Sequence, residues 1–348
     1  MAGAYAHLTV VSELNRSPEL FKLGVFADKE VGTLLQLGRF FQLGAISPDY
    51  PYLGLEAILE KLGLNANVIS DMDKFAKKFS INIGLPALTQ AISRMKAGLG
   101  IGSSQEWANA MHYQRTGDRL KAGIEYVKGM SGEEKYKALA WLLGFASHIV
   151  MDIAIHPIVE LKVGPYNENS KAHTTCEMHQ DVFIYKRLNI GTPNDSVFLQ
   201  GIAQCSEPKN ENQLDATICK VWGHMLKTTD AQLYKDKPPS FHAWHEQYRH
   251  LLAIAAPGPK KPWAFVRHQG FDGLMYPETP EDSYIKGLRT PQGIMSYTDI
   301  FDRAKGQVRK YWGMVASACL GREADLSQIK NWNLDTGRDE ANLLTCWE

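Results

Sequence analysis

The stretch GFASHIVMDIAIHP, residues 144–157, carries His148, Asp152 and His156 at intervals of four residues. Positions four apart on a helix share a face, so these three side chains form one polar stripe. The neighbouring residues are apolar, and an unpaired carboxylate buried among them would cost several kcal/mol. The stripe therefore requires either hydrogen-bond partners or metal ions.

A second pair, His173 and Glu177, lies four residues apart in KAHTTCEMHQDVFIYKRL. Imidazole and carboxylate without thiolate suit zinc, iron, manganese or nickel, and zinc is the commonest catalytic choice among them. Two helices that each offer a histidine and an acid indicate more than one ion. Asp152, with a histidine on either side of it, is a natural bridge between two cations.

Each pair alone also has a structural interpretation. His148 with Asp152 could be a buried hydrogen bond, and His173 with Glu177 could be a solvated pair. The metal-site interpretation is favoured because further candidates for ligands exist at His7, Asp49 and His112. For the separate histidines of HAWHEQYRH, residues 242–250, an exposed amphipathic helix is favoured over a second metal site.

The segments AYAH, PDYP, NAMHY, SHIVMD and HTTCE occur in this order in the first half of the chain. In this order and spacing they resemble the zinc-dependent phospholipases C. The resemblance implies an all-α, multi-helix fold that S1/P1-type nucleases share, here with additional C-terminal helices. The late motif ends in Glu177, where those nucleases have Asp, and this favours the phospholipase branch.

The resemblance also implies a ligand set for two or three zinc ions. The first zinc would be held by Asp49, His112, His148 and Asp152. The second would be held by His156, His173 and Glu177. The third would be held by His7 with Asp152 as the bridge.

Two departures from the family pattern affect this set. Asp152 and His156 are closer in sequence than the corresponding family residues, so His179 is the alternative ligand of the second zinc. Secreted family members use an N-terminal Trp at the third zinc, whereas this chain begins with Met1 and Ala2. The Ala2 amine, a water molecule, or no further ligand would then complete that site.

The implied activity is hydrolysis of the glycerol-side phosphodiester of glycerophospholipids, which releases diacylglycerol and a phosphorylated head group. A phosphodiester is anionic, and a cluster of zinc ions screens its charge, activates water and stabilises the leaving oxygen. Asp49 is the candidate catalytic residue that orients or deprotonates the water. The alternatives are an S1/P1-like nuclease or other zinc phosphodiesterase, and a non-enzymatic helical protein with structural metal.

Charge and composition bear on partners and location. The 348 residues include 38 basic and 38 acidic residues, so no basic excess supports a nucleic-acid partner. An apolar segment at residues 80–97, SINIGLPALTQAISRMKA, is assigned to core packing, with transient contact to a membrane surface as the alternative. The start lacks the features of a secretory signal, which predicts a cytoplasmic protein as synthesised, with export by a signal-less route left open.

The elements that would position these residues are helices, and no strand is predicted. A capping box at Ser131 and Glu134 predicts a helix from about residue 132 to His156, where Pro157 would end or kink it. Its apolar residues lie on all sides, which indicates a central core helix rather than a membrane span.

Further helices are predicted at residues 28–44, 107–117 and 171–188, with Gly117 at the end of the second. Helical patterns recur at residues 211–230, 240–256 and 297–320. Residues 257–294 form a long loop that could line or cover a cleft. The predicted domains are a metal-binding catalytic core at 1–190 and a C-terminal helical segment at 191–348, which either completes that domain or forms another.

Overall fold

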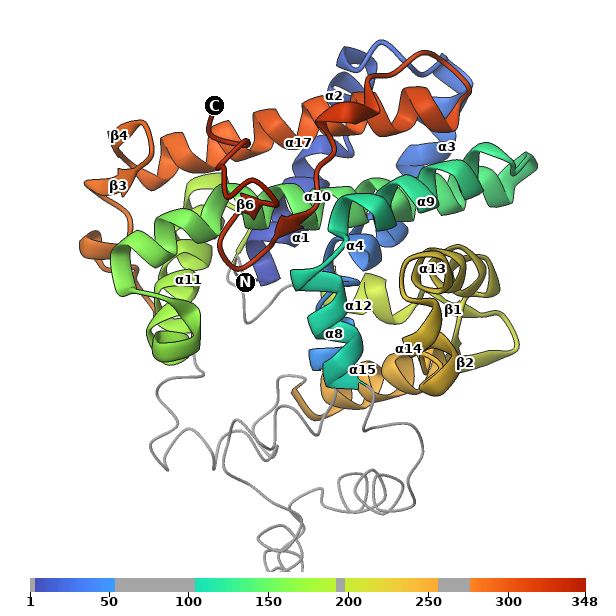
Figure 1. Cartoon of the computed structure of the whole chain (residues 1–348), viewed down its shortest axis with the longest axis horizontal. Coiled ribbons are helices and arrows are strands. Elements are labelled where there is room, and N and C mark those ends of the chain that lie inside the picture. Colours follow the sequence, from blue (N-terminus) through green and yellow to red (C-terminus); the bar gives the residue numbers. More distant parts are fainter. Residues whose placement is uncertain (1–3, 54–103, 192–197, 256–275) are drawn as a thin grey trace, which may run out of the picture.

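A computed structural model describes residues 4–53, 104–191, 198–255 and 276–348, and these residues are predominantly helical (Figure 1). The predicted all-α class is therefore confirmed. The helices are α1 Ala4–Leu14, α2 Ser17–Lys22, α3 Asp28–Gln36, α4 Gly38–Ile46, α8 Ser104–Tyr113, α9 Thr116–Lys128, α10 Gly132–Val163, α11 Tyr166–Leu188, α12 Phe198–Ala203, α13 Ala216–Thr229, α14 Ala231–Asp236, α15 Phe241–Ala255 and α17 Tyr297–Cys319. Short 3₁₀ turns occur at Tyr50–Leu53, Asp282–Tyr284 and Leu326–Gln328.

Short antiparallel strand pairs also occur in the described part of the chain, so the prediction of no strands was wrong. They are β1 Ser206–Glu207 with β2 Asn210–Leu214, β3 Leu288–Thr290 with β4 Gly293–Met295, and β5 Trp332–Asn333 with β6 Arg338–Asp339. Strands this short contain too few residues for an alternating pattern to stand out in the sequence.

Helix α10 is the central element of the fold. It packs against α4, α17, α9 and α11, and its residues from Ala138 to Val159 are buried (Figure 1). It is long and apolar enough to cross a membrane, yet the apolar window that meets this criterion is 100% buried in protein. It is a core helix, as the sequence favours.

The ends of several helices differ from the predictions. α10 begins at Gly132 as expected, but the Ser131 side chain makes no capping hydrogen bond and the helix continues through Pro157 to Val163. Proline disfavours a helix without forbidding it, and here tertiary packing keeps the residues around Pro157 helical. Of the two alternatives at Pro157, a helix end or a kink, the helix end was therefore wrong.

Three other boundaries also moved. The predicted helix at 28–44 is divided at Leu37 into α3 and α4. α8 ends at Tyr113, and Gly117 lies in the first turn of α9 rather than at the end of a helix. α11 begins at Tyr166 instead of residue 171 and contains one non-helical residue, Asn169.

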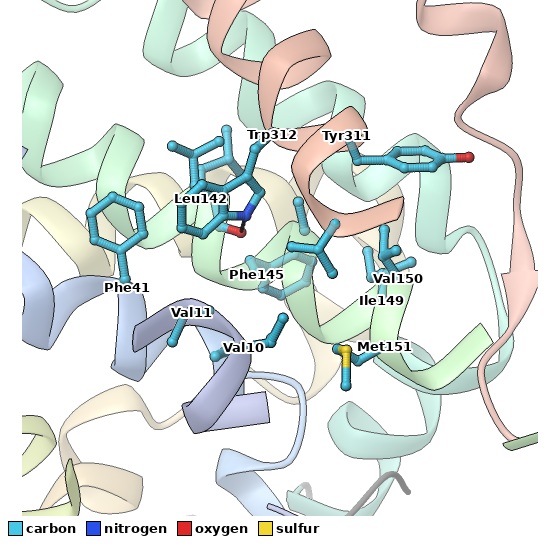
Figure 2. Packing of buried hydrophobic residues seen from close by; sticks show 14 of the residues in the cluster. Val10, Val11, Phe41, Leu142, Phe145, Ile149, Val150, Met151, Tyr311 and Trp312 are labelled. Atoms are coloured by element: carbon cyan, nitrogen blue, oxygen red, sulfur yellow. Dashed lines mark hydrogen bonds between the residues drawn. The ribbon is translucent and has the colours of Figure 1, made fainter. Parts of the chain in front are cut away.

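The C-terminal helix α17 is fixed to α10 by an indole. Trp312 Nε1 donates to the carbonyl of Leu143 at 2.8 Å and to Ser147 Oγ at 2.7 Å. The Trp312 ring also packs on Phe41 from α4, with ring centroids 5.0 Å apart (Figure 2). Elements from both ends of the sequence thus share one hydrophobic cluster with α10.

The crossing of α4 and α10 is set by two glycines. A Cβ atom added to Gly44 would lie 2.0 Å from the carbonyl oxygen of Trp141, and one added to Gly144 would lie 2.1 Å from that of Phe41. Real Cβ atoms do not approach backbone oxygens so closely, so the two helices can touch only because neither residue has a side chain. This contact brings the end of α4 next to His148 of α10.

Gly144→Ala tests this contact. The added methyl group should force the helices apart and lower the free energy of unfolding by about 2 kcal/mol or more. The measurement is thermal or urea denaturation. Gly306→Ala in α17 is the matched control, because a Cβ there meets no atom within 4 Å, and it should raise stability slightly, by up to about 1 kcal/mol. Equal stability of the two variants would contradict this account of the crossing.

Candidate metal centre

The predicted ligands come from five separate parts of the fold. Their side chains are buried, with at most 7% of any residue exposed. They are His7 from α1, Asp49 from the turn after α4, His112 from α8, His148, Asp152 and His156 from α10, and His173 and Glu177 from α11.

Two histidines are oriented by backbone carbonyl groups. His148 Nδ1 donates to the carbonyl of Ala45 at 2.9 Å, and His112 Nδ1 donates to that of Ala108 at 2.8 Å. These bonds place the proton on Nδ1 and leave Nε2 of each ring to face a carboxylate. His148 Nε2 lies 3.0 Å from Asp152 Oδ2, and His112 Nε2 lies 3.2 Å from Asp49 Oδ1. Such an outer hydrogen bond is the usual way a ligating histidine is held.

The carboxylate of Asp152 faces different histidines with its two oxygens. Oδ2 faces His148, whereas Oδ1 lies 3.2 Å from His7 Nε2 and 3.4 Å from His156 Nε2. Asp152 is fully buried. A carboxylate whose oxygens point to separate sets of nitrogen ligands has the geometry that a bridge between two cations requires.

The donor atoms of five of these residues fit a metal. In the described ranges, two overlapping groups have ligand atoms within 4.8 Å of one another: His7 with Asp49 and His148, and His112 with His148 and Asp152. His7 Nδ1 is buried without a hydrogen-bond partner among the described residues. Burial of such a nitrogen lowers the stability of the folded state unless a hydrogen bond or a metal ion replaces the lost water. A buried set of nitrogen and oxygen donors, open to more than one ion, is suited to zinc.

The side chains predicted for the second zinc, His156, His173 and Glu177, do not form a compact group of ligand atoms among the described residues. His173 and Glu177 are in neither of the two groups above. The His173 ring donates from Nε2 to the carbonyl of Gly164 at 2.6 Å, while Nδ1 makes no hydrogen bond within the described part of the chain. The geometry thus pairs His156 with Asp152, as the polar stripe indicated, although the family resemblance grouped it with His173 and Glu177.

The alternative ligand His179 is engaged elsewhere. Its Nδ1 accepts a hydrogen bond from the backbone N–H of Glu281 at 2.9 Å, and its ring stacks on Tyr284 with centroids 4.7 Å apart. Its Nε2 lies 3.8 Å from a carboxylate oxygen of Glu281. His156, rather than His179, is therefore the histidine that faces Asp152.

The electrostatics of the cluster follow from burial and close opposite charges. Burial opposes protonation of His148, but Asp152 and Asp49 outweigh it and raise the His148 pKa to about 9. Burial also opposes ionisation of Asp152, but His148 and His156 hold its pKa well below the usual value. Burial lowers the pKa of His7 and His156 and raises that of Glu177 to about 8. At neutral pH the centre thus combines the ionised Asp152 with neutral His7 and His156, which are the ligand forms that zinc binds. His148 is protonated there and would have to lose a proton to zinc.

Some functional candidates were missed from the sequence. Asp335, in the turn between β5 and β6, has Oδ1 at 4.0 Å from His156 Nδ1. The ring of Tyr166 lies edge-on to His173, with centroids 5.3 Å apart. Neither residue belongs to a motif, so only the fold could associate them with the centre.

One histidine of α15 differs from the expectation of an exposed helix, whereas His242 is exposed as expected. His245 is fully buried, with Nδ1 at 2.7 Å from Tyr50 OH and Nε2 at 2.8 Å from Ser206 Oγ. His242 Nδ1 accepts from the backbone N–H of Leu214 at 3.1 Å. Both residues have hydrogen-bonding partners that explain them without a metal.

Comparison with known proteins decides the family. A family model described as zinc dependent phospholipase C matches residues 6–232, which include every predicted ligand. The chain belongs to the zinc-dependent phospholipase C family. No curated protein and no solved structure gave a significant match. This phospholipase C is therefore a zinc-dependent hydrolase of phosphodiester bonds whose substrate is a lipid, as the sequence predicts.

The structure of this phospholipase C leaves two segments noted in the sequence wholly or partly outside the described residues. Residues 80–97 are outside the described residues, and so is the first part of the predicted loop at 257–294. The described remainder contains the 3₁₀ turn Asp282–Tyr284 and strand β3, so the prediction of one long loop was wrong there. At its start this remainder contacts α11, where Tyr276 OH donates to Asp181 Oδ2 at 3.0 Å.

Zinc uptake by the metal-free protein should release protons in a pH-dependent manner. At pH 7.5 His148 is protonated, because its pKa is about 9, and zinc must displace that proton. The contribution of His148 should be full near neutral pH and disappear as pH rises through about 9. Calorimetric titration with zinc in buffers of different ionisation enthalpy measures this release.

His148→Gln should abolish that contribution, and His224→Gln, at an exposed position on α13, should leave it unchanged. A proton release that is constant between pH 7 and 10, or equal in wild type and His148→Gln, would contradict the assignment.

Proposed function

We propose that this phospholipase C hydrolyses glycerophospholipids at a centre that Asp152 bridges, releasing diacylglycerol and a phosphorylated head group. The observation that carries the proposal is the division of the Asp152 oxygens between His148 on one side and His7 and His156 on the other. A single structural ion would need only one such set.

The residues divide into two sets that would hold at least two zinc ions. Asp49, His112 and His148 would hold one ion together with Asp152 Oδ2. His7 would hold another with Asp152 Oδ1, and His156 lies within reach of the same oxygen. For a third ion, supporting observations are the buried Glu177 and the unbonded Nδ1 of His173, both on α11.

Bound zinc supplies positive charge that screens the phosphate, makes water more acidic and stabilises the leaving oxygen. Asp49 is placed to accept the proton of the attacking water. Burial alone would raise the Asp49 pKa, but His148 and His112 hold it below its usual value. Asp49 is therefore ionised at neutral pH, with one oxygen facing His112 Nε2. The proton that Asp49 accepts from water balances the proton that the departing glycerol oxygen needs to leave as an alcohol.

The substrate and its surroundings follow from charge. The chain has no net charge at pH 7, which gives no general attraction to a nucleic-acid backbone. We therefore propose no nucleic-acid partner. Transient contact with a membrane surface is also part of the proposal, because the substrate is a lipid. A cytoplasmic location as synthesised, with signal-less export as the alternative, stays a prediction.

Asp152→Asn should be the most damaging conservative change at the centre. The amide keeps the shape but removes the charge that faces His7, His148 and His156. We expect loss of bound zinc and a fall in phospholipase activity of at least about 100-fold. Even a residue that only hydrogen-bonds to a metal ligand typically costs about 10–100-fold in metal affinity or activity when it is replaced. Metal content by mass spectrometry and the rate of diacylglycerol release measure the two effects.

Asp215→Asn is the matched control. Asp215 is also a buried carboxylate with a cationic partner, Lys137 at 2.7 Å, but it caps α13 far from the predicted ligands in sequence. Asparagine is an equally good cap, so zinc content and activity should persist. An Asp152→Asn variant with full zinc and full activity would refute the bridge.

The substrate assignment is tested by comparing mixed phospholipid micelles with single-stranded nucleic acid under the same conditions. Zinc-loaded protein should release diacylglycerol from the micelles and leave the nucleic acid intact. Efficient cleavage of nucleic acid with intact phospholipid would instead support the nuclease alternative.

A further inference from the structure

The C-terminal segment folds back onto α10, the helix that carries Asp152 and His156 (Figure 1). Trp347 Nε1 donates to the carbonyl of Ala154 on α10 at 3.1 Å. Between β5 and β6 the chain forms a compact turn, NLDTG, residues 333–337, in which the carbonyl of Asn333 accepts from the N–H of Gly337 at 2.8 Å. All of this lies beyond residue 232, where the family match ends.

This turn is anchored to the elements that carry predicted ligands. On one side, the backbone N–H of Leu334 donates to the carbonyl of His112 at 2.8 Å, and Thr116 Oγ1 exchanges hydrogen bonds with the backbone of Trp332. On the other side, Gly337 is so close to α10 that a Cβ would lie 2.6 Å from Pro157 Cγ and 2.7 Å from the carbonyl of Ile153.

Asp335 lies between these two anchors. Its backbone N–H donates to Asn333 Oδ1 at 3.0 Å, and its side chain is only 15% exposed. Asp335 Oδ1 lies 4.0 Å from His156 Nδ1. The negative charge of Asp335 also acts on His173, where it partly offsets the lowering of the pKa by burial.

The two nitrogens of His156 therefore face different carboxylates. Nε2 faces Asp152 at 3.4 Å, and Nδ1, which forms no hydrogen bond among the described residues, faces Asp335. His112 and His148 have the same polarity, with Nε2 toward a carboxylate ligand and Nδ1 toward an orienting oxygen. For those two histidines the orienting oxygen is a backbone carbonyl within 2.9 Å. On the corresponding side of His156 lies the carboxylate of Asp335, whose Oδ1 at 4.0 Å is beyond hydrogen-bond distance and has to approach Nδ1 to bond with it.

We infer that Asp335 is the positioning residue of His156: it accepts the Nδ1 proton and so presents Nε2 as a metal ligand beside Asp152. The inference rests on the proposed function, because it assumes that this centre binds zinc. A carboxylate in this position fixes the tautomer and orientation of the imidazole and raises its basicity. The C-terminal segment thereby contributes directly to the metal centre of the catalytic core.

The test compares Asp335→Ala and Asp335→Asn with wild type in the full-length protein. The readouts are the rate of zinc release to a chromophoric chelator and the melting temperatures of the zinc-loaded and metal-free forms. Asp335→Ala should lower the affinity for one zinc by about 10–100-fold and lower the melting temperature of the zinc-loaded form only. Asp335→Asn retains a side-chain oxygen that can accept the Nδ1 proton of His156, so its loss of zinc affinity should be smaller.

Asp325→Ala is the control from the same C-terminal segment. Asp325 is bound to Ser327 and Gln328 on the 3₁₀ turn, and its removal should not change zinc release. Three results would overturn the inference. The first is an unchanged rate of zinc release in Asp335→Ala. The second is a melting temperature that falls as much in the metal-free form as in the zinc-loaded form. The third is an equal loss of zinc affinity in the alanine and asparagine variants. The last would indicate direct ligation. Failure of wild type itself to bind zinc would contradict the proposed function instead.

Discussion

The direct contact between α4 and α10 is the constraint on which the metal centre depends. Gly44 and Gly144 allow each helix to touch the backbone of the other. As a result the carbonyl of Ala45, next to Gly44, accepts the Nδ1 proton of His148, four residues after Gly144. The same contact brings the turn after α4, and with it Asp49, to within 4.0 Å of His148. Side-chain packing between the helices would separate them and move Asp49 away from its partners.

A buried negative charge then determines what the centre can bind. Asp152 has no access to solvent, so its ionised form requires nearby positive charge or donors. Without metal, a protonated His148 supplies that charge, as its pKa of about 9 shows. His7 and His156 are held neutral by burial, so their nitrogens are available as ligands. Zinc bound between these groups would replace the proton on His148 and also satisfy the neutral rings. Folding and metal binding are coupled because both act on the same carboxylate.

Local patterns and the family resemblance together predicted the helical class and a set of residues, several of which the structure brings close to one another. The all-round hydrophobicity of residues 138–155 correctly identified the central helix, and the four-residue intervals placed His148, Asp152 and His156 on one face. The sequence could not show that the helix continues through Pro157 to Val163, because tertiary packing, not local preference, keeps that turn helical. Nor could it show how the ligands are grouped. The family resemblance grouped His156 with His173, whereas the four-residue spacing and the distances both place it beside Asp152.

Asp335 shows most clearly what sequence patterns omit. It follows a two-residue strand and belongs to no helical repeat, so its type and spacing carry no signal. Its position is determined by the contacts of its neighbours: Leu334 bonds to the backbone of His112, and Gly337 fits against Pro157 only because it lacks a side chain. Proline at 157 contributes here too, since it cannot donate a backbone proton to the carbonyl of Ile153, the group that Gly337 approaches. Pro157 within α10 and Gly337 in the C-terminal turn therefore fit against each other. Through them, residues beyond the family match reach a histidine of the catalytic core.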